Sequence, residues 1–208
     1  YGKENVVSLS VFYGQKHTKE LEAATKVAKY YGVEHMAIDL SLIFKDSDCS
    51  LLSHSTEEIP HESYAKQLEK TDGKPVSTYV PFRNGLFLAT AASIALSKKC
   101  DVIYYGAHAD DAAGNAYPDC SEVFYNAMNT AVYEGSGRQL KIEAPLVTWN
   151  KATVVKKGLE LINNTNNIEK ITIIGATEYL LEIFSPANIS LDLISSLSIF
   201  LLFLAFNR

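Results

Sequence analysis

The amino-terminal part of the chain follows a strand–helix–strand pattern. Val6–Tyr13 is rich in β-branched and aromatic residues, which is typical of a strand. Apolar residues then recur at helical spacing through Lys19–Tyr31, with Thr18 as a candidate N-cap and Gly32 as a helix-ending glycine. His35–Leu40 is again typical of a strand. Because a helical crossover joins two parallel strands by a right-handed connection, this pattern predicts an α/β fold.

Composition and charge exclude several classes of protein. Of the 208 residues, 47% are apolar and 21% are charged, as in a globular protein with one sizeable core. The net charge of −5 gives no reason to expect nucleic acid as a partner. The odd number of cysteines (Cys49, Cys100 and Cys120) includes no CxxC pair, which argues against a disulfide framework and a structural zinc site. Without a recognisable secretory signal, we expect a cytoplasmic protein, and the start at Tyr1 suggests that upstream residues are missing.

A polar loop follows a second buried strand. The apolar run Val102–Tyr105 ends at Gly106, and the loop after it is rich in Asp, Gly and Asn. Open α/β sheets bind their ligands just beyond the carboxyl ends of their strands, so the loop is expected to form one wall of a binding site. An ordinary acidic turn is the alternative. The polar residues of the loop include Asp110, Asp111, Asn115, Asp119 and Cys120.

The segment Thr78–Leu96 carries a second strong signal. Pro81 keeps the preceding residue extended, Asn84 is a candidate N-cap, and the apolar, Ala-rich run after it predicts a buried helix. Arg83 would then lie at a helix amino terminus, where free N–H groups and a guanidinium favour a phosphate. Pairing of Arg83 with a carboxylate of the polar loop is equally compatible with the sequence.

The remaining elements are less sharply defined. Ser41–Ser77 is polar and is expected to be a long loop with a turn or two of helix near His61–Leu68, serving as an active-site lid or as a disordered excursion. Lys151, after the candidate cap Asn150, is a second possible phosphate contact, although an exposed lysine without a role is a common alternative. The other expected elements are a helix at Ser121–Glu134 ended by Gly-Ser-Gly, a strand at Lys141–Ala144 and a helix at Lys151–Leu161.

The carboxyl-terminal part differs in character from the rest. Ile171–Gly175 resembles one more strand, and Leu191–Phe206 is almost wholly apolar. Its uninterrupted apolar core is shorter than the ~20 residues needed to span a bilayer, so the run is compatible with a buried helix, a weak membrane anchor or a tail from outside the normal reading frame. We therefore expect an α/β domain at residues 1–161, which binds nucleotide and substrate, and a divergent tail at residues 162–208.

Four segments together resemble the family of 7-cyano-7-deazaguanine synthases, which form preQ0 in queuosine biosynthesis. The combination of VPFRN with YPDC is the specific part of this resemblance, which extends over roughly residues 1–161. The four segments are Tyr13–His17 (YGQKH), Val80–Asn84 (VPFRN), the Gly106–Cys120 loop with its YPDC ending, and Glu143–Leu146 (EAPL).

The resemblance implies a fold and an activity. The fold is a doubly wound parallel sheet, Rossmann-like and of the adenine-nucleotide α-hydrolase type found in N-type ATP pyrophosphatases. The activity is that of an ATP-dependent ligase, which activates 7-carboxy-7-deazaguanine as an adenylate and uses ammonia to reach the amide and then the nitrile. The resemblance further implies Mg²⁺ as a cofactor, a homodimer and a zinc site formed by a cluster of four cysteines.

The resemblance also implies roles for individual residues. Arg83, with Asn84, would contact nucleotide phosphates or the adenylate, and Lys151 would assist the departure of pyrophosphate. Asp119 would accept hydrogen bonds from the N–H edge of the deazapurine. Tyr117 and Cys120 would shape that pocket. Tyr13, Gln15 and His17, which follow a strand end, would bind substrate. Asp110 and Asp111 would bind the cofactor.

The sequence departs from the family pattern in two places. It contains no SGGxDS motif, the family's phosphate-binding loop, and no cysteine after residue 120 for the zinc cluster. In the family the strand before SGGxDS is central, between the counterparts of the Val6 and Val102 strands, so we expect the first central strand to be missing. We therefore expect the chain as given to be marginally stable and inactive. The alternatives are a non-catalytic nucleotide-binding module, another N-type ATP pyrophosphatase acting on a tRNA base, and a protein anchored to a membrane by Leu193–Phe206.

Overall fold

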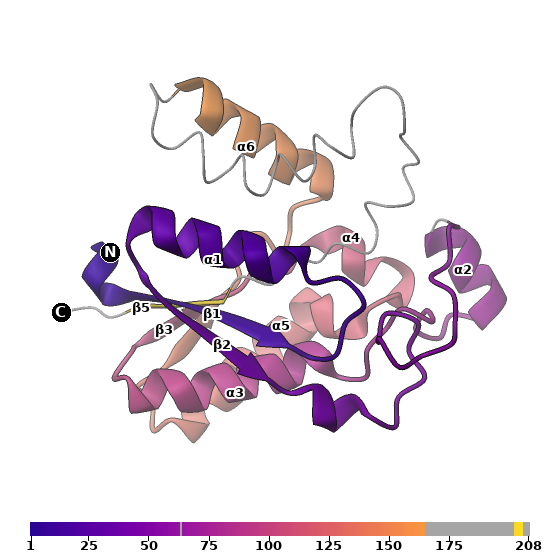
Figure 1. The fold of residues 1–208 in the computed structure, drawn as a ribbon, viewed down its shortest axis with the longest axis horizontal. Helices are drawn as coiled ribbons and strands as arrows, with labels where there is room; N and C mark the ends of the chain where they lie inside the picture. The colour runs from indigo at the N-terminus through magenta and orange to yellow at the C-terminus, as the bar shows by residue number, and fades with distance from the viewer. Residues whose placement is uncertain (63, 165–201, 206–208) are drawn as a thin grey trace.

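The computed structural model describes residues 1–62, 64–164 and 202–205. These residues form an α/β structure with a single five-stranded sheet (Figure 1). The strands are β1 (Val6–Phe12), β2 (Glu34–Asp39), β3 (Val102–Tyr104), β4 (Lys141–Glu143) and β5 (Leu202–Ala205). The helices are α1 (Lys19–Tyr31), α2 (Tyr64–Thr71), α3 (Arg83–Ser97), α4 (Ala109–Ala112), α5 (Glu122–Gly135) and α6 (Lys151–Asn164).

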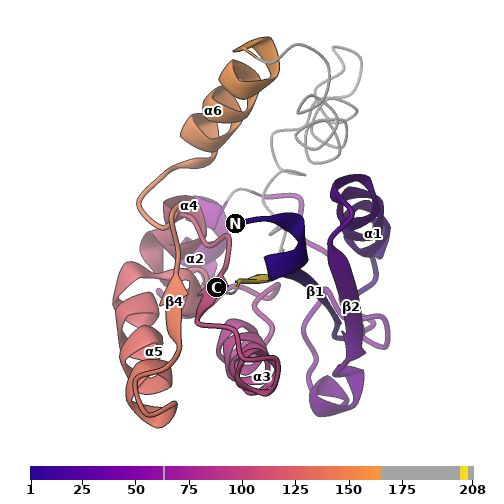
Figure 2. The same cartoon turned by 90° about the vertical axis from the view of Figure 1, so that its left-hand side faces the viewer.

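The sheet has the strand order β2-β1-β5-β3-β4 (Figure 2). β1 pairs with β2 in parallel, with Val7 opposite Glu34, and β3 pairs with β4 in parallel, with Ile103 opposite Ile142. The parallel pairing of β1 and β2 through α1 confirms the expected strand–helix–strand unit. β1 and β3 both run antiparallel to β5, so their carboxyl ends lie at the same edge of the sheet.

Helix α1 ends as its sequence predicts. Gly32 adopts a left-handed conformation, with φ of 64°, and its N–H bonds to carbonyls of the last turn. Thr18 occupies the N-cap position, but its side chain makes no capping hydrogen bond. The helix packs its small buried residues, Ala24 and Ala28, toward the β1–β2 pair.

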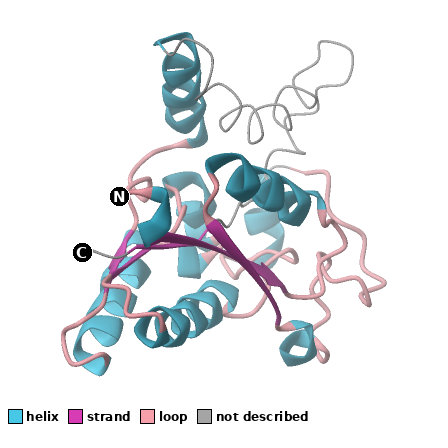
Figure 3. Cartoon of the chain, turned by 60° about the vertical axis from the view of Figure 1, so that its left-hand side comes forward, coloured by secondary structure: helices cyan, strands magenta, loops and turns pink. Residues whose placement is uncertain are grey.

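Helices cover the sheet on both faces. Figures 1 and 3 show α1 on one face and α3 with α5 on the other. The core between the sheet and these helices is built from apolar strand residues and from the buried side of α3, as the Ala-rich run predicts. Its most deeply buried members include Leu9, Ile103, Ile142, Phe87 and Leu88.

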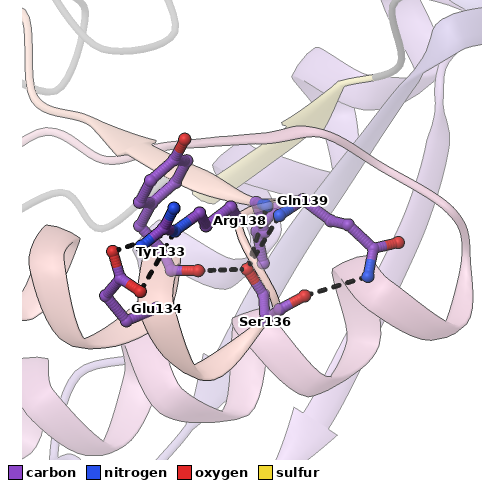
Figure 4. A network of polar contacts seen from close by, with 6 residues as sticks. Tyr133, Glu134, Ser136, Arg138 and Gln139 are labelled. Atoms are coloured by element: carbon purple, nitrogen blue, oxygen red, sulfur yellow. Dashed lines mark hydrogen bonds and ion pairs between the residues drawn. The ribbon is translucent and has the colours of Figure 1, made fainter.

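A hydrogen-bonded turn joins the end of α5 to β4 (Figure 4). The Ser136 hydroxyl donates to the Tyr133 carbonyl and accepts from the backbone N–H groups of Gln139 and Leu140. The Gln139 amide donates in turn to the Ser136 carbonyl. Because these bonds satisfy the backbone groups at the helix end, α5 stops at Gly135 within the Gly-Ser-Gly segment, as predicted.

The centre of the sheet holds β5 rather than a gap. The position between β1 and β3 is the one that we expected to lack a strand, and the described segment Leu202–Ala205 takes it. The expectation of a buried helix is wrong for this segment, because β5 pairs with strands on both sides. The strand expected at Ile171–Gly175 lies outside the described residues. Among the helices that the structure describes, none has the length and hydropathy needed to cross a membrane.

Candidate functional site

Three segments meet at the carboxyl ends of β1 and β3. They are the turn after β1, the start of α3 and the polar loop between β3 and α5. In the loop, α4 is followed by short 3₁₀ turns at Ala113–Asn115 and Pro118–Cys120. The structure therefore places most of the sequence-predicted site residues along one edge of the sheet, where open α/β folds bind their ligands.

The start of α3 is held by the polar loop. The prediction that Asn84 is the N-cap is wrong, because α3 begins at Arg83 and its N-cap position, Phe82, has a left-handed φ of 52° and makes no side-chain cap. Instead the Asp119 carboxylate accepts a 2.9 Å hydrogen bond from the Asn84 N–H. The Asn84 amide donates to the Asp119 carbonyl at 3.0 Å and to Cys120 Sγ at 3.1 Å. A carboxylate from a distant segment thus performs the capping function.

Arg83 lies in an aromatic enclosure next to this contact. Its side chain is 7% exposed, and Nη1 donates a 3.0 Å hydrogen bond to the Tyr13 hydroxyl. The guanidinium carbon lies 5.0 Å from the ring centre of Tyr13 and 5.9 Å from that of Phe87, within the range of cation–π attraction. Burial raises the pKa of the nearby Asp119 carboxyl, and the positive charge of Arg83 opposes that rise. Arg83 is therefore a buried cation positioned beside a buried carboxylate.

Burial affects the protonation of Asp119 and Cys120 in the YPDC segment. Burial raises the pKa of Asp119, although the Asn84 N–H and Arg83 counteract the shift. Burial likewise raises the pKa of the Cys120 thiol far above its ordinary value, so this thiol is protonated at neutral pH and is unsuited to nucleophilic attack. Tyr117 is also buried, and its hydroxyl shares a hydrogen bond with that of Thr78.

A second polar group joins the loop to α6. Asp110 Oδ2 accepts a 2.7 Å hydrogen bond from the Lys151 backbone N–H, and Asn150 caps α6 through the Thr153 N–H, as predicted. The Lys151 ammonium lies 3.3 Å from Asp111 Oδ1. His108 Nε2 lies 3.3 Å from Asp111 Oδ2.

These contacts bear on the predicted binding of a cofactor by Asp110 and Asp111. Both carboxylates are committed to partners within the chain, and Asp111 is only 2% exposed. Among the described residues, no group of three or more His, Cys, Asp or Glu side chains is arranged to hold a metal ion. The binding of a cofactor by Asp110 and Asp111 and the role of Lys151 toward pyrophosphate therefore stay predictions.

The turn after β1 contributes Gln15 and an additional acid. The Tyr13 N–H donates to Gln15 Oε1 at 2.9 Å, which fixes the Gln15 side chain in a buried position. His17 lies exposed at the surface. The structure places Glu20, from the first turn of α1, within electrostatic reach of His17 and Arg83. Sequence reasoning missed Glu20, because an acid in the first turn of a helix is ordinary.

Comparison with known proteins identifies relatives. The family model for the queuosine biosynthesis protein QueC matches residues 2–171. The 7-cyano-7-deazaguanine synthase of Archaeoglobus fulgidus is 37% identical over 161 residues, covering 77% of this chain and 64% of the relative. That of Caldicellulosiruptor saccharolyticus is 38% identical over 154 residues, with 74% and 64% covered, and that of Oceanobacillus iheyensis is 37% identical over 166 residues, with 77% and 71% covered. The chain thus spans about two thirds of the length of these curated relatives.

Proposed function

The chain belongs to the QueC family of queuosine biosynthesis proteins, and from this we propose that it acts in the formation of 7-cyano-7-deazaguanine. The proposed reaction is ATP-dependent. The carboxylate of 7-carboxy-7-deazaguanine attacks the α-phosphorus of ATP, which releases pyrophosphate and gives an acyl adenylate. Ammonia then displaces AMP to give the amide, and a second activation with ATP allows the amide oxygen to leave as the nitrile forms.

One observation carries this proposal. The Arg83–Asn84 pair at the start of α3 is joined by hydrogen bonds to the Asp119–Cys120 pair at the end of the polar loop. The pairing places a permanent positive charge and a helix amino terminus beside the strand ends, where an anionic adenylate would be stabilised. The reaction needs no nucleophilic side chain from the protein, which agrees with a protonated Cys120 thiol.

The predicted site residues other than Asp110 and Asp111 retain a proposed role. Arg83 and Asn84 stabilise the nucleotide phosphates or the adenylate, and Lys151 at the start of α6 assists pyrophosphate release. Asp119 holds the loop against α3 and, with Tyr117 and Cys120, forms the substrate wall. Tyr13, Gln15 and His17 line the opposite side, on the turn after β1.

The finer features of the fold and of the assembly belong to the same proposal. We infer a doubly wound sheet of the adenine-nucleotide α-hydrolase type, in which β5 takes the central position that the family gives to the strand before SGGxDS. The helices on both faces and the position of β5 between β1 and β3 support this inference. A cytoplasmic homodimer that uses ATP and Mg²⁺ is the corresponding expectation for the assembled enzyme.

A binding and reconstitution experiment tests the proposal. Calorimetric titration of the purified chain should show saturable binding of 7-carboxy-7-deazaguanine, without nitrile formation, because the sequence has no SGGxDS motif. A chimera that adds a strand with an SGGxDS loop and a four-cysteine cluster, the two features that the family resemblance implies, should form 7-cyano-7-deazaguanine from ATP and ammonia, as detected by mass spectrometry. Arg83→Ala in the chimera should abolish that product.

Other outcomes favour the alternative functions. Binding of ATP by the chain, with no binding of any deazapurine and no product from the chimera, would indicate a non-catalytic nucleotide-binding module. Pyrophosphate release that depends on added tRNA would indicate an N-type ATP pyrophosphatase acting on a tRNA base.

A further inference from the structure

Phe82 combines an exposed aromatic ring with a strained backbone. The residue lies at the N-cap position of α3, with φ of 52° and ψ of 29°, and its side chain is 57% exposed. The left-handed region is disfavoured for a bulky residue, because Cβ comes too close to the backbone. Glycine or asparagine would adopt this backbone more easily and would leave no aromatic ring in water.

The other non-glycine residues with positive φ lie at ordinary positions. Among the described residues they are Asp72, Lys99, Asn115 and Arg138. Asp72, Lys99 and Arg138 come shortly after the ends of α2, α3 and α5, where a left-handed residue is common. Asparagine tolerates this conformation through its short polar side chain. Phe82 differs from all four, because it lies at the start of a helix and is aromatic.

Neighbouring residues hold the Phe82 ring in one position. Its backbone N–H donates a 2.9 Å hydrogen bond to the Tyr79 hydroxyl. The ring lies against Gly85, where an added Cβ would clash with the ring carbons of Phe82. The Phe124 ring lies perpendicular to it, with the ring centres 5.8 Å apart. Backbone strain that the surroundings enforce in this way is typical of ligand-binding positions.

These contacts connect Phe82 to the predicted substrate wall. The Tyr79 ring lies 6.4 Å from the ring of Tyr117, and the Tyr79 hydroxyl is within electrostatic reach of Asp119. Arg83, which is proposed to stabilise the adenylate, follows Phe82 directly. The Phe82 ring therefore lies at the rim of the candidate site. Because more than half of the side chain is exposed, a planar group can reach it without rearrangement of the protein.

We propose that the exposed ring of Phe82 stacks on the bicyclic base of the deazapurine substrate. Stacking requires a flat, rigid and accessible ring, and the contacts with Gly85 and Phe124 supply that rigidity. The ring would bind the face of the base, whereas Tyr117 and Asp119 are proposed to bind its edge. This inference rests on the proposed function, because it adds a residue to the substrate site of that function.

A fluorescent ring at this position gives the first test. Phe82→Trp in a Trp149→Phe background leaves one tryptophan, because the chain has only Trp149. Titration with 7-carboxy-7-deazaguanine should quench its fluorescence saturably, because stacking places the base on the indole. The control is Leu96→Trp in the same background, at an exposed position near the opposite end of α3, and it should show no saturable quenching.

The second test removes the ring and the strain together. Glycine accepts the left-handed backbone, so Phe82→Gly should keep or raise the melting temperature. Loss of stacking should weaken calorimetric binding of 7-carboxy-7-deazaguanine at least fivefold, about 1 kcal/mol. Phe82→Tyr keeps the ring and should bind as the parent chain does. Weaker binding without loss of stability distinguishes a ligand contact from a residue that only packs.

Each contrary result has a distinct meaning. Parent-like binding by Phe82→Gly, or absence of quenching in a Phe82→Trp variant that still binds, overturns the inference and leaves the proposed function intact. Quenching by ATP but not by the deazapurine would assign the ring to adenine and would also overturn it. If Phe82→Trp does not bind, the result for Phe82→Gly decides, and a lowered melting temperature in that variant would show that the ring only packs. Absence of binding by the parent chain overturns both the inference and the proposed function.

Discussion

The Asp119 carboxylate accepts a hydrogen bond from the backbone N–H of Asn84, over a distance of 2.9 Å. Asn84 lies in the first turn of α3, and Asp119 lies 35 positions later, in the polar loop after β3. Through this bond the end of the polar loop caps the helix that carries Arg83, so the position of the guanidinium depends on the loop.

Loss of this cap should destabilise the chain. Asp119→Ala leaves the buried Asn84 N–H without its acceptor, and we expect a loss of about 1–2 kcal/mol in the free energy of unfolding. Asp119→Asn keeps an acceptor oxygen and should stay close to the parent value. Urea denaturation followed by circular dichroism measures both, and equal stability of Asp119→Ala and the parent chain would contradict this account of the cap.

Tyr13 should support Arg83 through its hydroxyl as well as its ring. Tyr13→Phe keeps the ring beneath the guanidinium but removes the acceptor of the 3.0 Å bond from Nη1. Hydrogen bonds to charged groups typically contribute about 1.5–3 kcal/mol, so we expect a loss toward the lower end of that range in the same urea measurement. A change smaller than the error of the measurement would mean that the ring alone positions Arg83.

Acid should destabilise the fold through His108. Burial lowers the pKa of His108 below its ordinary value, and the nearby Lys151 ammonium acts in the same direction, while Asp110 and Asp111 oppose it. Below pH ~6.5 the unfolded chain therefore binds the proton first, so the stability that neutral His108 provides is lost as the pH falls toward its folded pKa.

His108→Gln should therefore lose less stability than the parent chain between about pH 7 and pH 5.5. The comparison between the two proteins isolates the contribution of His108. Asp119 and Glu20 have raised pKa values, so their protonation stabilises the fold on acidification in both proteins. Thermal melts across this range supply the two profiles. Parallel profiles would show that His108 is not the group responsible.

The position of β5 at the centre of the sheet predicts a severe effect of charge at Ala205. This residue is 1% exposed and lies opposite Val6 on one side and Val102 on the other. Ala205→Asp buries an unpaired carboxylate and should cost about 3–5 kcal/mol. Val123→Asp introduces the same group at an exposed position of α5 and should change the melting temperature little. Equal melting temperatures for the two variants would show that β5 does not occupy the sheet in solution.

Local signals in the sequence predicted the elements, and longer-range contacts determined the site. The β1–α1–β2 unit, the glycine at the end of α1 and the Asn150 cap each depend on residues close together in the chain, so periodicity and capping rules found them. The cap of α3 comes from Asp119, on a segment distant in sequence. Local capping rules consider only residues next to the helix start, so they favoured Asn84 as the cap.

Two further features depend on how distant segments pack. The apolar run that ends in β5 could be read as a helix, because periodicity does not show which strands a segment will join. Glu20 resembles any other acid at a helix start, and its electrostatic interaction with Arg83 arises only from packing. Both features depend on contacts between segments that are distant in sequence and that meet only in the folded sheet.

A crystal structure of the chain with 7-carboxy-7-deazaguanine tests the central claim most directly. The account predicts that the base lies at the carboxyl ends of β1 and β3, between the turn after β1 and the polar loop, with its carboxylate toward Arg83. Density for the compound at a site remote from both Arg83 and Asp119, or a saturated crystal with no bound compound, would contradict it.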